Sequence, residues 1–172
     1  MGVPMNGEGN HGDMFLSVKG AQKGVINGES EDGAHPKEIE VLAWGWGMNQ
    51  RLAPGGGTAP TGRASIHELK ITKSVDCAST GLMWALRTNE IITAAVLTVR
   101  KAGKTPLEFL KIKLGDARVS SIDIQGGVPP GSVGVVEVVT FAFNKISIEY
   151  YGQGRDGQSL GGFNFEDEFH PQ

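Results

Sequence analysis

The sequence predicts a mainly β protein, an antiparallel two-sheet β-barrel or sandwich with one short α-helix at its side. Seven or eight segments alternate apolar and polar residues, as half-buried strands do. Only one segment, about 79–89, places apolar residues at helical spacing. Glycine makes up 26 of 172 residues, about twice the ~7% average, which indicates many turns. Because strands and helices do not alternate, an antiparallel arrangement is favoured over a parallel one.

Length and composition indicate one soluble globular domain over residues 1–172. The net charge of -3 argues against a nucleic-acid binder, which usually has a basic excess. Cys77 is the only cysteine, so no disulfide can form within the chain. The first residues lack the pattern of a signal peptide, and no apolar run approaches ~18 residues. We therefore expect a cytoplasmic protein whose export, if any, uses a route that reads the folded chain.

The first part of the chain alternates strands with glycine-rich loops. Residues 1–12 are glycine-rich and polar, and are expected to be flexible. A strand is predicted over 14–18, followed by a long loop over 20–37 that holds four glycines and a proline. A second strand covers 38–43, and an extended glycine- and proline-rich loop covers 47–63. The residues expected on the core side of the second strand are Ile39, Val41 and Ala43.

A strand and the predicted helix come next. Residues 66–73 alternate again, with His67, Leu69 and Ile71 on the apolar face. Ser79 is the candidate N-cap of the helix, since its hydroxyl can accept a backbone N–H. The helix is short and contains Gly81, so packing must stabilise it. Its apolar stripe is formed by Leu82, Met83, Ala85 and Leu86.

Four further strand segments follow the helix, at 92–101, 107–114, 117–125 and 135–150. The alternation changes phase between Val119 and Ile122, which predicts a bulge. It changes phase again between Phe143 and Ile146, as in a strand that bends from one sheet to another. Periodicity does not decide whether residues 152–172 form an edge strand or a loose acidic tail.

Several motifs that carry chemistry in other proteins fail their structural requirements here. Gly152-Gln-Gly-Arg-Asp-Gly157 matches the dinucleotide pattern, but the residues after it are poor helix formers, so we interpret it as a turn. The charged loop that contains Glu29, Glu31, Asp32 and His35 lacks the ligand spacing of a calcium site. The four histidines lack the paired spacing of a zinc site. The sequence therefore predicts no cofactor and no metal.

Two residues allow a catalytic interpretation without requiring one. Cys77 could act as a nucleophile with a remote histidine, but a lone cysteine beside an apolar helix is more often a small buried hydrophobe. His67 is expected to be a core or boundary histidine on its strand. No nucleophile elbow is present. We therefore predict no catalytic residues.

Trp84 does not fit a simple core. At about 100° per residue it points away from the apolar stripe of the predicted helix. A tryptophan on an outer helix face indicates either an interface or a residue covered by a neighbouring loop. The sequence leaves both interpretations open.

The order of many short motifs resembles the haemolysin-coregulated protein (Hcp) family of bacterial type VI secretion systems over roughly residues 13–151. No single motif is decisive, and their order and spacing carry the resemblance. Thr80 and Cys77 depart from the family pattern, in which proline and lysine are common at these places. The matching segments are Met14-Phe-Leu16, Gly28-Glu-Ser30, Asp32, His35, Glu38-Ile-Glu-Val-Leu-Ala-Trp44, Trp46-Gly47, Thr72-Lys73, Asp76-Cys-Ala-Ser79, Leu82-Met83, Leu97-Thr-Val-Arg-Lys-Ala-Gly103, Val119-Ser-Ser121, Glu137, Phe141, Phe143 and Tyr150.

This resemblance implies a structural rather than a catalytic role. Homohexameric rings would stack into a tube that a contractile sheath expels from the cell behind a spike protein. The lumen would carry effector proteins, and export would need no signal peptide. No nucleic-acid partner and no membrane insertion are expected. Alternatives left open are a non-stacking β-barrel that binds a peptide or carbohydrate, and an enzyme that uses Cys77 or His67.

Two sets of residues are candidates for contacts within such an assembly. The loop over 47–63 is the candidate for ring-to-ring contact, and the outer face of the helix is the candidate lumen surface that meets effectors. The stacking candidates are Gln50, Arg51, Leu52, Pro54, Gly55, Gly56 and Gly57. The effector-contact candidates are Ser79, Thr80, Trp84, Arg87 and Thr88.

Overall fold

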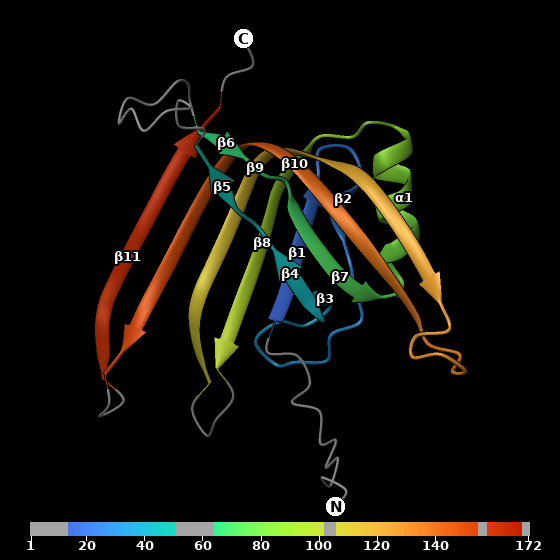
Figure 1. Ribbon diagram of the computed structural model, residues 1–172, viewed down its shortest axis with the longest axis horizontal. Coiled ribbons are helices and arrows are strands. Elements are labelled where there is room, and N and C mark those ends of the chain that lie inside the picture. Colours follow the sequence, from blue (N-terminus) through green and yellow to red (C-terminus); the bar gives the residue numbers. More distant parts are fainter. Residues whose placement is uncertain (1–13, 51–63, 102–105, 155–157, 170–172) are drawn as a thin grey trace, which may run out of the picture.

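The computed structural model describes residues 14–50, 64–101, 106–154 and 158–169. Over these residues the chain forms short and long β-strands and one α-helix, so the mainly β prediction is confirmed (Figure 1). The strands are β1 (Met14–Gly20), β2 (Gly24–Ile26), β3 (Ile39–Glu40), β4 (Ala43–Gly45), β5 (Met48–Asn49), β6 (Ser65–Ile66), β7 (Leu69–Ser74), β8 (Ile92–Lys101), β9 (Leu107–Gly126), β10 (Val135–Gln153) and β11 (Ser159–Glu168). The helix is α1 (Ala78–Arg87).

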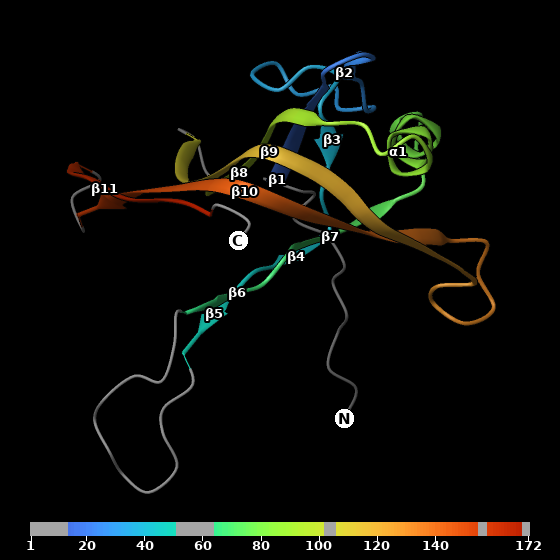
Figure 2. The same cartoon turned by 90° about the horizontal axis from the view of Figure 1, so that it is seen from above.

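Nine of the described strands form one antiparallel sheet. Its order is β2-β1-β8-β9-β10-β7-β4, with β3 also paired to β1 and β11 also paired to β10. The remaining pair, β5 and β6, forms a separate hairpin. Figure 2 shows β1, β2, β3 and α1 on one side of the layer formed by β9, β10 and β11, with β4, β5 and β6 on the other. The predicted antiparallel arrangement is therefore confirmed.

The core lies where the strands curve round one another and α1 covers them. The strand residues that point inward recur at every second position, which is the period of a β-strand. α1 contributes its buried stripe of Ala78, Leu82 and Ala85. The largest fully buried apolar side chains are Leu16, Ile39, Leu69, Ile71, Leu82, Ile92, Leu97, Ile112 and Phe141.

Strand β10 connects the two halves of the sheet. One edge pairs with β9 over almost its whole length, and the other pairs first with β7 and then with β11. The change of partner falls between Phe141 and Lys145, where the sequence predicted a slip. The register with β9 also shifts, because Thr140 lies opposite Ser121 while Phe141 lies opposite Val119. This shift confirms the predicted bulge in residues 117–125.

Two strand predictions in the first half of the chain were incomplete. The loop predicted over 20–37 contains β2, which turns back onto β1. The strand predicted over 38–43 breaks in two, because β3 pairs with β1 whereas β4 pairs with β7. Ile39 and Val41 are buried as expected, but Ala43 is exposed because the chain changes partner after Val41.

The helix starts differently from its prediction. It begins at Ala78, with Cys77 rather than Ser79 at the N-cap position. A carboxylate oxygen of Asp76 accepts the Ala78 N–H at 2.9 Å, so an aspartate satisfies this first turn. No helix within the described ranges is long and apolar enough to cross a membrane.

Candidate assembly surface

The outer part of the sheet, which we call the wing, presents an apolar face. The wing comprises residues 107–114 of β9, residues 145–153 of β10 and the whole of β11. Tyr150 lies opposite Leu110 on one side and Phe163 on the other. Residues directly opposite in an antiparallel pair point to the same face of the sheet. The apolar face of the wing is formed by Leu110, Ile148, Tyr150, Phe163 and Phe165.

The aromatic side chains of this face are open to solvent. Phe163 is 65% exposed, Tyr150 46% and Phe165 39%. The rings of Tyr150 and Phe163 lie with centroids 6.5 Å apart, so they form one continuous aromatic surface. Contiguous exposed apolar surface on a soluble protein marks an interaction site.

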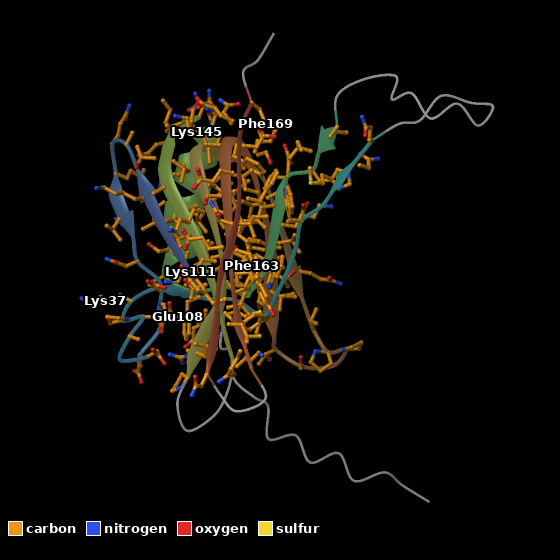
Figure 3. The ribbon with its side chains drawn as sticks, turned by 90° about the vertical axis from the view of Figure 1, so that its left-hand side faces the viewer. Lys37, Glu108, Lys111, Lys145, Phe163 and Phe169 are labelled. Atoms are coloured by element: carbon orange, nitrogen blue, oxygen red, sulfur yellow. The ribbon has the colours of Figure 1, made fainter. Side chains whose placement is uncertain are left out.

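The opposite face of the wing carries charges instead. Lys113 Nζ lies 2.6 Å from Glu149 Oε1, and Lys145 Nζ lies 3.4 Å from Glu168 Oε1. The Lys113 ammonium lowers the pKa of Glu149 below its ordinary value, because it donates a hydrogen bond to the carboxylate. Figure 3 views the sheet from the β11 edge, with Lys111 on one side and Phe163 on the other. One face of the wing is therefore suited to water, and the other is suited to a protein partner.

A groove of about 300 Å³ lies at the base of the wing. The rings of Phe143 and Phe169 meet there with centroids 6.3 Å apart. Phe169 is fixed by its backbone N–H, which donates to the Asn144 carbonyl at 2.6 Å. The groove is lined by Ile66, His67, Glu68, Ala142, Phe143 and Phe169. These residues belong to β6, to the two residues after it, to β10 and to the end of the chain that the structure describes. Figure 2 shows the β5–β6 hairpin diverging from the sheet.

A second exposed surface surrounds Trp84 on α1. This side chain is 58% exposed, and the Lys23 ammonium lies 5.4 Å from its ring centroid. The buried Glu90 fixes the turn that carries Lys23, because its Oε1 accepts the N–H groups of Gln22 and Lys23 at 2.9 and 2.7 Å. A neighbouring turn therefore covers part of Trp84 and leaves most of it accessible.

Comparison with known proteins places these surfaces in context. The family model described as "Type VI secretion system effector, Hcp" matches residues 15–150. The chain belongs to the Hcp family. It is 36% identical over 152 residues to the protein Hcp1 of Pseudomonas aeruginosa, covering 87% of this chain and 90% of that relative. It is thus a type VI secretion protein of the Hcp type.

Solved structures of Hcp proteins share the fold. A type VI secretion system effector from Yersinia pestis superposes with a TM-score of 0.71 at 28% identity, covering 90% of this chain and 98% of that one. Hcp1 from Salmonella typhimurium gives a TM-score of 0.70 at 30% identity, covering 91% of this chain and 95% of that one.

One of the effector-contact candidates on this Hcp chain is wrong. Ser79 is only 2% exposed, and its hydroxyl donates to Glu137 Oε1 at 2.7 Å while Lys73 Nζ lies 3.2 Å away. The residue belongs to the first helical turn, which faces the sheet, and it is therefore unavailable to a partner. The other four candidates, Thr80, Trp84, Arg87 and Thr88, are exposed.

The stacking candidates lie almost wholly outside the described residues. Gln50 is exposed directly after β5, whereas Arg51, Leu52, Pro54 and Gly55 to Gly57 fall in the range that the structure does not describe. Sequence reasoning missed the wing, because it left the region after Gly152 unassigned. The alternation of Phe163 and Phe165 with Asn164 was the signal available there.

The residues weighed for catalysis in this Hcp chain do not come together as a site. Cys77 is exposed, not a buried hydrophobe, and its thiol contacts the Asn27 carbonyl at 3.2 Å. His67 is exposed as well, because the inward alternation of β7 begins only at Leu69. Within the described ranges no group of three or more His, Cys, Asp or Glu side chains is arranged to hold a metal ion. The element that follows the Gly152 motif is the strand β11 and not a helix.

Proposed function

We propose that this chain is the structural subunit of a type VI secretion inner tube, in which homohexameric rings stack and carry effectors in their lumen. The observation that supports this most strongly is the apolar face of the wing, which is exposed in the single chain while the opposite face is charged. A second copy of the chain would cover it. Membership of the Hcp family supports the same assignment.

A ring requires two different complementary patches on each subunit. The apolar face of the wing would be one of them, and it would meet a different surface of the next copy, so that the rotation closes after six. Burying a phenylalanine side chain contributes about 1.5–3 kcal/mol. Phe163 and Phe165 together would supply a substantial part of each of six identical contacts.

Stacking of the rings is assigned to the loop that includes Gln50, Arg51, Leu52, Pro54 and Gly55 to Gly57. Ordering this glycine-rich loop on assembly would cost conformational entropy. Stacking should therefore be weak and reversible without a template. A variant with residues 50–61 shortened should keep its rings and lose its tubes in electron micrographs. Tubes that form as readily as those of the parent would exclude this role.

Effector contact is assigned to the outer face of α1, where Thr80, Trp84, Arg87 and Thr88 are exposed. Trp84 offers a large exposed ring, and the Lys23 ammonium lies 5.4 Å from its centroid. Tryptophan is enriched among the residues at the centres of protein interfaces that contribute most to binding. In this proposal α1 faces the lumen of the ring.

The remaining partners follow from the tube. A contractile sheath would surround it and a spike protein would cap it. The subunit would reside in the cytoplasm until expulsion and would then be found outside the cell, without a signal peptide, nucleic-acid partner or membrane insertion. Its role would be structural and not catalytic.

Negative-stain microscopy of the purified protein tests the proposal. Ring-shaped particles with a hollow centre are expected. The competing function is a non-stacking β-barrel module that binds a peptide or carbohydrate, and it predicts single compact particles at every concentration. Uniform single particles would therefore overturn the tube assignment.

A further inference from the structure

His35 is buried between two carboxylates. Its side chain is only 8% exposed. The ring stacks on Phe15 with centroids 4.5 Å apart and an interplanar angle of 10°. Nδ1 lies 2.8 Å from Glu38 Oε2, and Nε2 lies 2.9 Å from Glu108 Oε1. Both ring nitrogens therefore have a carboxylate oxygen at hydrogen-bond distance.

The charges around this ring determine its protonation. The second oxygen of Glu108 lies 2.6 Å from Lys111 Nζ. The hydrogen bond from Lys111 lowers the pKa of Glu108 below its ordinary value, so Glu108 is ionised at neutral pH. An ionised carboxylate only accepts hydrogen bonds, and a neutral imidazole has only one N–H to donate. Two carboxylates, one at each nitrogen, are satisfied only by the doubly protonated ring.

We propose that His35 is held as an imidazolium between Glu38 and Glu108, and that loss of its proton opens the loop of residues 27–38. We call this segment the acidic loop. His35 joins it to β9 through Glu108 and to β1 through Phe15. This pH-sensitive latch does not depend on the tube assignment.

Other contacts of the acidic loop are internal, made at its two ends, or made by Asp32, whose carboxylate pairs with Arg100 of β8 at 2.6 Å. Within the loop, the N–H groups of Gly28 and Lys37 donate to the carbonyls of Lys37 and Ser30, each at 2.8 Å. Glu29 Oε1 accepts the N–H of Cys77 at 3.2 Å, which links the loop to the start of α1. Opening the latch would therefore uncover Phe15 and release this link to α1.

The charged groups around His35 come from three elements. From the acidic loop, Glu38 faces the ring, and Asp32 accepts the backbone N–H of His35 at 3.2 Å. Glu108 and Lys111 face it from β9. Arg100 of β8 lies over Phe15 at 5.1 Å and pairs with Asp32 at 2.6 Å. Because Arg100 neutralises Asp32 and Lys111 neutralises part of Glu108, the remaining negative charge favours a protonated ring.

The sign of the pH dependence follows from this arrangement. The closed loop holds a proton that a free imidazole, with a pKa of about 6.5, loses above that pH. Opening then releases one proton, so the opening constant should rise about tenfold per pH unit while the closed form stays protonated. At the acid end, protonation of the carboxylates removes the acceptors. The latch should therefore be tightest in mildly acidic solution and should loosen as the pH rises above neutrality.

Two measurements on the full chain test the latch. Selective ¹⁵N-histidine labelling should show both ring nitrogens of His35 bearing hydrogen at pH 7, with the exposed His67 as an internal reference. Hydrogen-exchange protection of the Gly28, Ser30 and Lys37 amides, corrected for the intrinsic pH dependence, should fall at least tenfold between pH 6.5 and 8.5. Protection of the core strands should stay constant over this range.

Matched variants separate the latch from a structural role. Glu108→Gln replaces one carboxylate with an amide, which can donate a hydrogen bond to the unprotonated nitrogen of a neutral ring. The pH dependence of hydrogen-exchange protection should therefore become smaller. His35→Gln should leave protection low at every pH, and His67→Gln should behave as the parent. Circular dichroism checks that each variant is folded. A neutral His35 ring at pH 7, or protection independent of pH in the parent, would overturn the proposal.

Discussion

Lys73 of β7 and Glu137 of β10 lie directly opposite each other in the sheet, with Nζ and Oε1 2.5 Å apart and both side chains fully buried. Lys73 also donates to Asp76 Oδ1 at 2.7 Å and to the Ser79 hydroxyl at 3.2 Å. Asp76 and Ser79 flank the start of α1. This buried ion pair therefore joins two strands of the sheet to the helix that packs over them.

Removing one member of this pair should strongly destabilise the fold. Lys73→Met leaves Glu137 as a buried charge without its counterion, which costs about 3–5 kcal/mol in comparable pairs. The double variant Lys73→Met with Glu137→Met should be more stable than Lys73→Met alone, because no buried charge remains between them. Urea unfolding at one protein concentration measures both. Additive losses in the double variant would show that the two charges are not coupled.

The wing should determine the oligomeric state without supporting the fold of the single chain. Replacing Phe163 and Phe165 by serine removes apolar surface that is exposed in the single chain and that the proposed ring contact would bury. Each replacement should weaken association at least about tenfold, since about 1.4 kcal/mol corresponds to a factor of ten. Analytical ultracentrifugation should show dissociated chains, while circular dichroism stays unchanged.

The matched control for the wing lies on the same strand. Asn164 is exposed on the charged face, opposite Glu149, so Asn164→Ser should assemble as the parent does. If the Phe163 and Phe165 variants assembled as well as Asn164→Ser, the apolar face would not be part of the ring contact.

The exposed face of α1 should act on cargo and not on assembly. Trp84→Ala removes the large ring of the proposed effector surface, and the hexameric rings should remain intact because the side chain is not part of the core. Co-purification of an effector expressed with the subunit should fall several-fold. Lys70→Ala, at an exposed position on β7, serves as the control. Cargo retained at the parental level by Trp84→Ala would remove α1 from the effector surface.

The pairing of Arg100 with Asp32 should stabilise the fold near neutral pH and lose this contribution as the pH falls. Its hydrogen bonds and charge hold the pKa of Asp32 well below the usual range. A carboxylate with a depressed folded-state pKa contributes stability above its unfolded value of about 3.9, and this contribution is lost as the pH falls. Arg100→Gln should therefore flatten the decline of stability between pH 5 and pH 2.

Urea midpoints measured across that range test the effect. The comparison concerns the slope and not the absolute stability, because Arg100 also packs over Phe15 and its loss lowers stability at every pH. Lys70→Gln should keep the parental slope. An unchanged slope in Arg100→Gln would show that the pairing with Asp32 does not contribute to the loss of stability in acid.

The sequence predicted those parts of the fold in which one side of a strand is buried. Leu69 and Ile71 alternate with polar residues in β7 and point inward as expected. Lys73 shares their phase, and its burial depends on Glu137, which lies 64 residues away. A charged pair formed between distant strands leaves no local pattern. The prediction that Ala43 faces the core was wrong for a related reason, because the change of strand partner after Val41 depends on tertiary structure.

The candidate assembly surface was harder to predict than the core. Residues 160–168 of β11 are exposed on both faces, so no burial in the single chain selects a period. The pairing of β11 with β10 is what aligns Phe163 with Tyr150. The resemblance to the Hcp family was available from sequence because it rests on motif order, whereas the position of the wing required the register of the sheet.

Native mass spectrometry of the purified chain, followed through serial dilution, tests self-association most directly. We expect a species of six copies that dissociates only at low concentration, and that is absent from the Phe163 and Phe165 double variant. A parent protein that has the mass of a single chain at every concentration would contradict the proposed assembly.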